Sequence, residues 1–145
     1  MKILILNGPN LNLLGRRQPE IYGSKSMEEI LGDIARAYPE TEIEYFQSNH
    51  EGELIDALHR AWLHDNVSGI VFNAGAYTHT SIALADAIAA VEIPVVEVHL
   101  SNVSAREPVR RQSMIAPVCC GTIAGFGADS YRLGVEALLK MLCKE

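Results

Sequence analysis

Short runs of aliphatic and β-branched residues alternate along this chain with longer stretches of helical periodicity. The short runs are residues 2–6, 41–46, 69–72, 94–98 and 122–124. The helical stretches, with apolar residues three and four positions apart, are 27–37, 52–63, 82–91 and 130–142. Strands that are separated by helices pair in parallel through right-handed crossovers, so the pattern predicts an α/β fold built on a parallel sheet.

The number and order of these segments predict the topology of the sheet. We expect five parallel strands in the flavodoxin-like order 2-1-3-4-5, with helices on both faces. The chain has 145 residues and shows no internal repeat or linker. A single flavodoxin-like domain spanning residues 1–145 is therefore expected.

Charge and composition argue against several classes of protein. Twelve Lys and Arg against 18 Asp and Glu give a net charge of −6, which disfavours nucleic acid or an anionic membrane as a partner. No apolar run approaches the roughly 20 residues of a spanning helix, and no signal-peptide pattern is present, so we expect a cytoplasmic protein. Cys119, Cys120 and Cys143 form no CxxC pair, and we interpret them as reduced, mostly buried thiols without a structural metal.

Residues 8–25 (GPNLNLLGRRQPEIYGSK) form an unusually long connection. Connections in α/β units normally take about two to six residues, and longer ones are usually functional or disordered. We interpret this segment as a lid over an active site. It carries Arg17 and Tyr22, and a guanidinium beside a phenol stabilises the phenolate, which can remove a weakly acidic C–H proton. A solvated Arg and Tyr in a loop is the plainer alternative.

A second stretch outside the predicted sheet, residues 101–116, carries Arg106, Arg110 and Arg111. Arg106 and Arg110 are four positions apart. A short helix here would place both guanidinium groups on one side.

Polar residues gather at the predicted carboxyl ends of the strands, where open parallel sheets bind their ligands. Asn10 follows the first strand and Asn73 ends the third. In the fourth strand, the period of two places Glu97, His99 and Ser101 on one face. Either a hydrogen-bonded network at the sheet edge or a general acid–base histidine oriented by the carboxylate explains these three residues.

His79 and Asp86 stand out around the start of the third helical stretch. His79 lies near the expected helix start, where either a surface or capping role or a ligand contact is open. Asp86 lies two turns further along, among Ala and Ile residues. A carboxylate on such an apolar helix predicts a buried contact, either a salt bridge or a subunit interface.

Three segments together resemble the type II 3-dehydroquinate dehydratases, or type II dehydroquinases. Residues 6–23 (LNGPNLNLLGRRQPEIYG) match the signature of that family without a gap. Residues 73–81 (NAGAYTHTS) and 97–103 (EVHLSNV) resemble it in order and spacing, so the resemblance spans essentially the whole chain. It implies a flavodoxin-like lyase of the shikimate pathway that dehydrates 3-dehydroquinate to 3-dehydroshikimate without metal or cofactor.

The resemblance also implies roles for individual residues. Tyr22 would remove the C2 proton, Arg17 would keep Tyr22 ionised, and His99 would act as the general acid for the C1 hydroxyl. Asn10 would help hold a water that stabilises the enolate, and Glu97 would orient His99. The residues implied to bind the substrate are Asn73, His79, Leu100, Ser101 and Arg110.

The same resemblance implies a homododecamer, a tetramer of trimers, in which Asp86 reaches a neighbour's active site. The chain departs from the family around its last arginines. Pro108-Val109 replaces the usual acidic and aromatic pair, and Ser104 stands where a histidine is common. Because proline fixes φ and lacks an N–H, this departure bears on the path of the chain to Arg110.

An alternative function of a different class is a flavodoxin-like module that binds a phosphate or a flavin in the same crevice. The chain has no P-loop, and Gly125-Phe126-Gly127 is followed by Ser130 where a GxGxxG motif needs its third glycine. These absences and the net negative charge argue against that alternative.

Overall fold

A computed structural model describes residues 1–143, so the last two residues of the expected domain, 144–145, lie outside the described residues. The strands are β1 (Lys2–Asn7), β2 (Glu42–Gln47), β3 (Gly69–Asn73), β4 (Val95–His99) and β5 (Gly121–Ala124). The α-helices are α1 (Pro19–Tyr22), α2 (Met27–Ala37), α3 (Glu51–Leu63), α4 (Ile82–Ala90) and α5 (Asp129–Leu142). The short 3₁₀ turns are η1 (Leu11–Leu13), η2 (Gly75–His79), η3 (Val103–Ala105), η4 (Pro108–Arg111) and η5 (Ala116–Val118).

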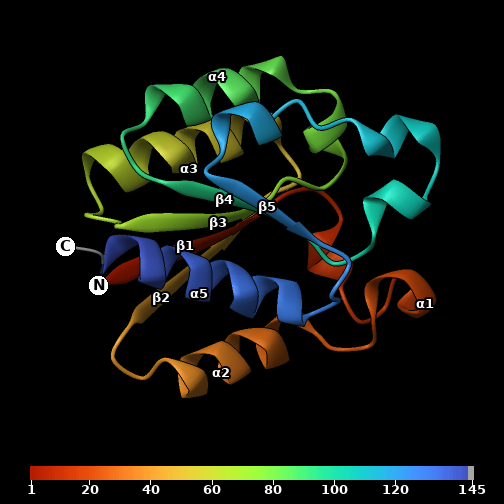
Figure 1. Ribbon diagram of the computed structural model, residues 1–145, viewed down its shortest axis with the longest axis horizontal. Coiled ribbons are helices and arrows are strands. Elements are labelled where there is room, and N and C mark those ends of the chain that lie inside the picture. The colour runs from red at the N-terminus through yellow and green to blue at the C-terminus, as the bar shows by residue number, and fades with distance from the viewer. Residues whose placement is uncertain (144–145) are drawn as a thin grey trace.

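All five strands pair in parallel in the order β2-β1-β3-β4-β5, which confirms the predicted topology. Helices α3 and α4 cover one face of the sheet and α2 and α5 cover the other (Figure 1). Strands β1, β3 and β4 each run one residue beyond the predicted end, to Asn7, Asn73 and His99. Polar side chains do not prevent this extension, because the ladder uses main-chain groups alone.

Two hydrophobic cores form because the side chains of the central strands alternate between the faces of the sheet. In β1, Leu4 and Leu6 pack toward α3 and α4, whereas Ile3 and Ile5 pack toward α2 and α5. Burial on both faces is the normal state of a parallel sheet with helices on each side. Among the described residues, no helix is both long enough and apolar enough to cross a membrane.

The long connection after β1 contains two short helices, η1 and α1. Leu11 and Leu14 are buried and anchor its first part to the core between the sheet and α2. Ser26 then closes the connection by forming a capping box with Glu29 at the start of α2. The segment is therefore anchored to the core at its first part and to the start of α2 at its end, and α1, with Tyr22 at its last position, lies between these anchors.

The prediction of one short helix carrying both Arg106 and Arg110 is wrong. The backbone is extended at Arg106 and again at Glu107, so η3 and η4 are separate turns. The reason is Pro108, which disfavours helical backbone in the residue before it and occupies the first position of η4.

The prediction that the cysteines are mostly buried is also wrong. Cys120 and Cys143 are exposed and Cys119 is half-buried, and all three are free thiols. Cys119 and Cys120 precede β5, an edge strand that has only β4 as a neighbour, so this part of the chain is open on one side. Burial, together with the nearby charge of Glu97, raises the pKa of the Cys119 thiol to about 12.

Gly8 brings the carboxyl ends of β1 and β3 into direct contact. Its N–H donates to the carbonyl oxygen of Asn73 at 2.7 Å. A Cβ atom added at this position would lie 2.5 Å from the carbonyl oxygen of Ala74, which is well inside van der Waals contact. Only glycine allows the two strand ends to approach this closely.

We expect Gly8→Ala to lower the free energy of unfolding by about 2 kcal/mol or more, because the added methyl group meets backbone that cannot rotate away. Urea unfolding measures this change. Gly52→Ala in α3 is the matched control, since a Cβ there meets nothing within 4 Å. The control should gain about 0.5 kcal/mol or remain unchanged. Equal stabilities for the two variants would contradict the close-approach argument.

Candidate active site

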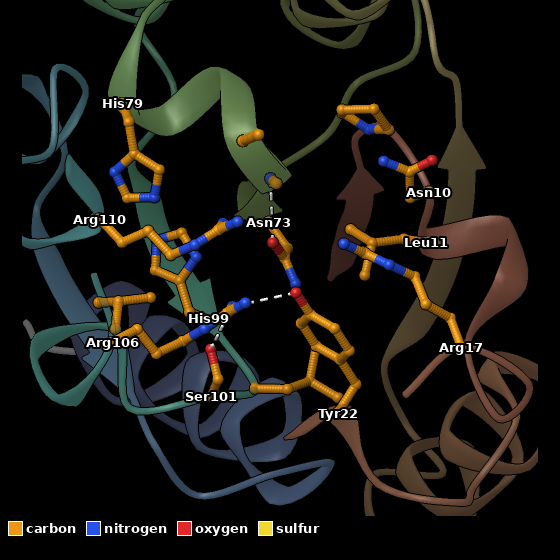
Figure 2. A pocket seen from close by; sticks show the side chains of 15 residues that line it. Asn10, Leu11, Arg17, Tyr22, Asn73, His79, His99, Ser101, Arg106 and Arg110 are labelled. Carbon is orange, nitrogen blue, oxygen red and sulfur yellow. Dashed lines mark hydrogen bonds between the residues drawn. The ribbon is translucent and has the colours of Figure 1, made fainter. Parts of the chain in front are cut away.

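One pocket lies at the carboxyl ends of β1, β3 and β4, where the sequence placed its cluster of polar residues (Figure 2). We call it the rim pocket. Its lining residues are Pro9, Asn10, Leu11, Arg17, Tyr22, Asn73, Gly75, Ala76, His79, His99, Leu100, Ser101, Val103, Arg106 and Arg110. The cavity volume is about 70 Å³, several times the space that one water molecule needs.

Two arginines flank the phenol of Tyr22. Arg106 Nη1 donates a hydrogen bond of 3.0 Å to Tyr22 Oη. The guanidinium carbon of Arg17 lies 4.6 Å from the centroid of the Tyr22 ring, and that of Arg106 lies 5.3 Å from it. Both cations are therefore placed to stabilise negative charge on the phenol oxygen.

Arg106 lines the pocket although the sequence patterns predict no role for it in the site. They place it only among three arginines after the fourth strand, on a helix that the structure does not contain. Its side chain is mostly buried, and it also approaches Ser101 Oγ at 3.4 Å. One sequence feature does point to Arg106: three arginines lie close together in the connection that follows the carboxyl end of β4.

His99 is held by a buried carboxylate. Its Nε2 lies 2.6 Å from Oε2 of Glu97, whose side chain is 1% exposed. Ser113 Oγ donates to both carboxylate oxygens at 3.0 and 3.1 Å, and Thr122 Oγ1 donates to Oε1 at 3.3 Å. Glu97 thus acts as an acceptor on every side, so it also accepts the hydrogen on His99 Nε2 and leaves Nδ1 as the nitrogen available to the pocket.

The direction of the Ser113 hydroxyl is itself set by the backbone. Ala116 N–H donates to Ser113 Oγ at 2.9 Å, so the hydroxyl hydrogen is directed to Glu97. Neither Ser113 nor Thr122 was selected from the sequence, because no periodicity relates them to the fourth strand.

His79 lines the rim pocket next to His99. It ends η2, and its Nδ1 lies 2.8 Å from the carbonyl oxygen of Gln112, so Nδ1 carries the hydrogen. The rings of His79 and His99 are stacked, with centroids 6.2 Å apart. His79 thus presents Nε2 as an acceptor or, when protonated, as a donor.

The asparagines come from the ends of β1 and β3. Asn73 is 3% exposed, and its Oδ1 accepts the N–H of Gly75 at 3.1 Å. Asn10 has a left-handed backbone with φ of 69°, which Asn tolerates better than most residues. Its N–H donates to Asn49 Oδ1 at 3.0 Å, and Figure 2 shows its side chain at the pocket wall.

Arg110 lines the rim pocket although Pro108 changes the path of the chain. Its Nε pairs with both carboxylate oxygens of Glu107 at 3.1 and 3.2 Å. Leu100 and Ser101 line the same pocket, so the fold brings these two residues and Arg110 together with the other predicted lining residues.

Two predicted site residues do not line the rim pocket: Glu97, which lies behind His99, and Asp86, which is remote from the predicted partners in the pocket. Asp86 lies on the exposed side of α4 and forms no ion pair with any other described residue. The expected intrachain salt bridge is therefore absent from residues 1–143, and only the interface interpretation remains.

The charge of the rim pocket is opposite to that of the whole chain. Its described lining includes three arginines and two histidines and no Asp or Glu. Within residues 1–143, no three His, Cys, Asp or Glu side chains gather in a way that could hold a metal ion. The arrangement can bind an anion and transfer protons from two sides.

Comparison with protein families gives one match over nearly the whole chain. The model of the family described as dehydroquinase class II matches residues 1–139. A relative from Chlorobaculum tepidum, named 3-dehydroquinate dehydratase, is 58% identical over 137 residues, which cover 94% of this chain and 93% of the relative. A relative of the same name from an Exiguobacterium species is 55% identical over 97% of this chain and 95% of its own length.

Solved structures agree with the family match. The type II dehydroquinase from Butyrivibrio crossotus superimposes with a TM-score of 0.92 and 45% identity, covering 96% of this chain and 97% of that one. The type II dehydroquinase from Propionibacterium acnes gives a TM-score of 0.88 and 36% identity, covering 99% and 97% of the two chains. With the family model, the curated relatives and the solved structures in agreement, the chain belongs to the class II dehydroquinase family.

Proposed function

We propose that this protein is a hydro-lyase that removes water from 3-dehydroquinate to form 3-dehydroshikimate in the shikimate pathway. The observation that carries the proposal is the pairing, in one pocket, of a phenol flanked by two guanidinium groups with an imidazole backed by a buried carboxylate. The first group suits a base and the second a general acid. Membership of the class II dehydroquinase family favours this function over the phosphate- or flavin-binding alternative.

In the proposed mechanism, Tyr22 and His99 divide the two proton transfers. The Tyr22 phenolate takes the C2 proton of the substrate, and the resulting negative charge passes to an enolate. His99 then donates a proton to the C1 hydroxyl, which leaves as water while the C1–C2 double bond forms. Arg17 and Arg106 hold the phenolate, and Glu97 orients His99 by accepting from its Nε2.

Binding of the substrate carboxylate and hydroxyls is assigned to the remaining polar lining. Asn73, His79 and Arg110 bind these groups through their side chains, and Leu100 and Ser101 contribute backbone or hydroxyl contacts. Asn10 helps to hold a water near the developing enolate. The positive lining of an acidic protein supports an anionic substrate, because a local cluster of arginines attracts a small anion despite a net charge of −6.

We also propose that the protein works in the cytoplasm as a homododecamer, a tetramer of trimers. The outer side of α4 exposes Ile82, which is 61% accessible, together with Ala83, Ala89 and Ala90. Exposed apolar surface on a helix favours contact with another protein surface. Asp86 lies on this side of α4, where it could reach the rim pocket of a neighbouring subunit.

Incubating the purified protein with 3-dehydroquinate should produce the ultraviolet absorbance of the conjugated enone. Tyr22→Phe should lower kcat by about 10²-fold or more, because it removes the base. Tyr38→Phe, whose hydroxyl bonds Glu136 outside the rim pocket, should retain wild-type activity. A wild-type rate no higher than that of Tyr22→Phe would count against the proposed function.

Arg17→Ala and Arg106→Ala should each lower kcat by about 10²-fold and change KM much less, because both residues act through the Tyr22 phenolate. The double variant should lose less activity than the product of the single losses, since the two arginines share one phenol. Steady-state kinetics on the four proteins measure this. Arg111→Ala is the control, because Arg111 does not line the rim pocket. An increase in KM with unchanged kcat would argue against this role.

Native mass spectrometry should give an assembly of twelve chains of 15.9 kDa each. Ile82→Asp should shift the mass toward smaller species, because it buries a charge in the proposed α4 interface. Leu63→Asp, an equally exposed position at the end of α3, tests whether any charge on an exposed apolar residue has this effect. A wild-type protein that remains monomeric at micromolar concentration would rule the assembly out.

A further inference from the structure

We propose that Tyr131 is a positioning residue of the rim pocket, because its hydroxyl orients the Asn73 amide so that Asn73 donates a hydrogen bond to an acceptor oxygen of the substrate. The inference rests on the proposed function and adds to it. Tyr131 belongs to α5, does not line the pocket, and was not selected from the sequence.

The Tyr131 hydroxyl lies between the last residues of two central strands. Tyr131 is completely buried and packs in the core on the α2 and α5 side of the sheet. Its Oη donates to Asn7 Oδ1 at 2.8 Å and accepts from Asn73 Nδ2 at 3.0 Å. Asn7 and Asn73 are direct neighbours in the register of β1 and β3.

The direction of each hydrogen bond follows from the partners of Asn7. The Asn7 amide nitrogen faces Met27 Sδ at 3.3 Å and Tyr45 Oη at 3.4 Å, so its oxygen faces Tyr131. A phenol has one hydrogen, which Asn7 Oδ1 receives, and toward Asn73 the Tyr131 oxygen can then only accept. Burial raises the pKa of Tyr131 above its usual range, so the hydroxyl keeps this hydrogen.

A backbone group independently sets the other end of the Asn73 amide. Asn73 Oδ1 accepts the N–H of Gly75, and a reversed amide would bring two donors together there. It would also set the amide oxygen against the Tyr131 oxygen. Both ends therefore select the same orientation, and an unpaired buried amide on either side would be costly.

The remaining hydrogen on Asn73 Nδ2 is the part of this amide that the ligand can use. Asn73 lines the rim pocket, and Figure 2 shows it between His99 and Asn10. A fixed N–H donor selects an acceptor, such as a carboxylate, carbonyl or hydroxyl oxygen, over a donor group. Because the amide is oriented before binding, the substrate does not have to order it.

The test is the kinetics of Tyr131→Phe, which keeps the buried ring and removes only the hydroxyl. KM for 3-dehydroquinate should rise by about 5- to 10-fold with kcat nearly unchanged, since Asn73 loses the acceptor that orients it. Tyr45→Phe is the matched control. It removes the hydroxyl at the far end of the same network, which does not touch Asn73, and its KM should stay at the wild-type value.

Folded Tyr131→Phe protein with an unchanged KM, or with only a lowered kcat, would overturn the inference. If Tyr131→Phe does not fold, a crystal structure of the wild-type protein with bound 3-dehydroshikimate decides the matter. Asn73 Nδ2 should lie within hydrogen-bond distance of both Tyr131 Oη and a ligand oxygen, and an amide that contacts only one of them would overturn the inference. Inactive wild-type protein would instead defeat the proposed function, whereas active wild type and Tyr45→Phe confine any failure to Tyr131.

Discussion

Burial of the central strands on both faces is the constraint on which the rest of this structure depends. Strands β1, β3 and β4 have helices above and below, so most of their side chains are apolar. Their buried polar residues lie at or near the carboxyl ends, and these are Asn7, Asn73, Glu97 and His99. Parallel pairing brings these ends to one edge of the sheet, and the rim pocket forms there.

Polar groups at this edge are buried, and each therefore needs a partner. A buried carboxylate such as Glu97 costs on the order of several kcal/mol unless donors surround it. His99, Ser113 and Thr122 supply those donors from three parts of the chain. Asn73 is likewise held by Tyr131 of α5 and by the backbone of Gly75. Because these partners hold the polar groups in place, the pocket is ordered before a ligand binds.

The arrangement of charge separates the pocket from the rest of the surface. The arginines of the pocket come from two irregular connections, residues 8–25 and 101–116, rather than from the sheet. Arg106 joins these connections by donating to Tyr22 Oη. This hydrogen bond links the segment after β1 to the segment after β4, and both residues line the rim pocket.

Local patterns were enough to predict the strands, the four longer helices, the order of the sheet and the placement of Glu97 and His99 on one face of β4, because periodicity depends on residues close in sequence. Helix α2 was predicted at its observed bounds, Met27–Ala37. The roles of Arg106, Ser113, Thr122 and Tyr131 could not be predicted in this way. Each acts on a residue from a different element, and Tyr131 lies 124 positions from Asn7. Such contacts exist only after the connections have packed, and no pattern along the chain records them.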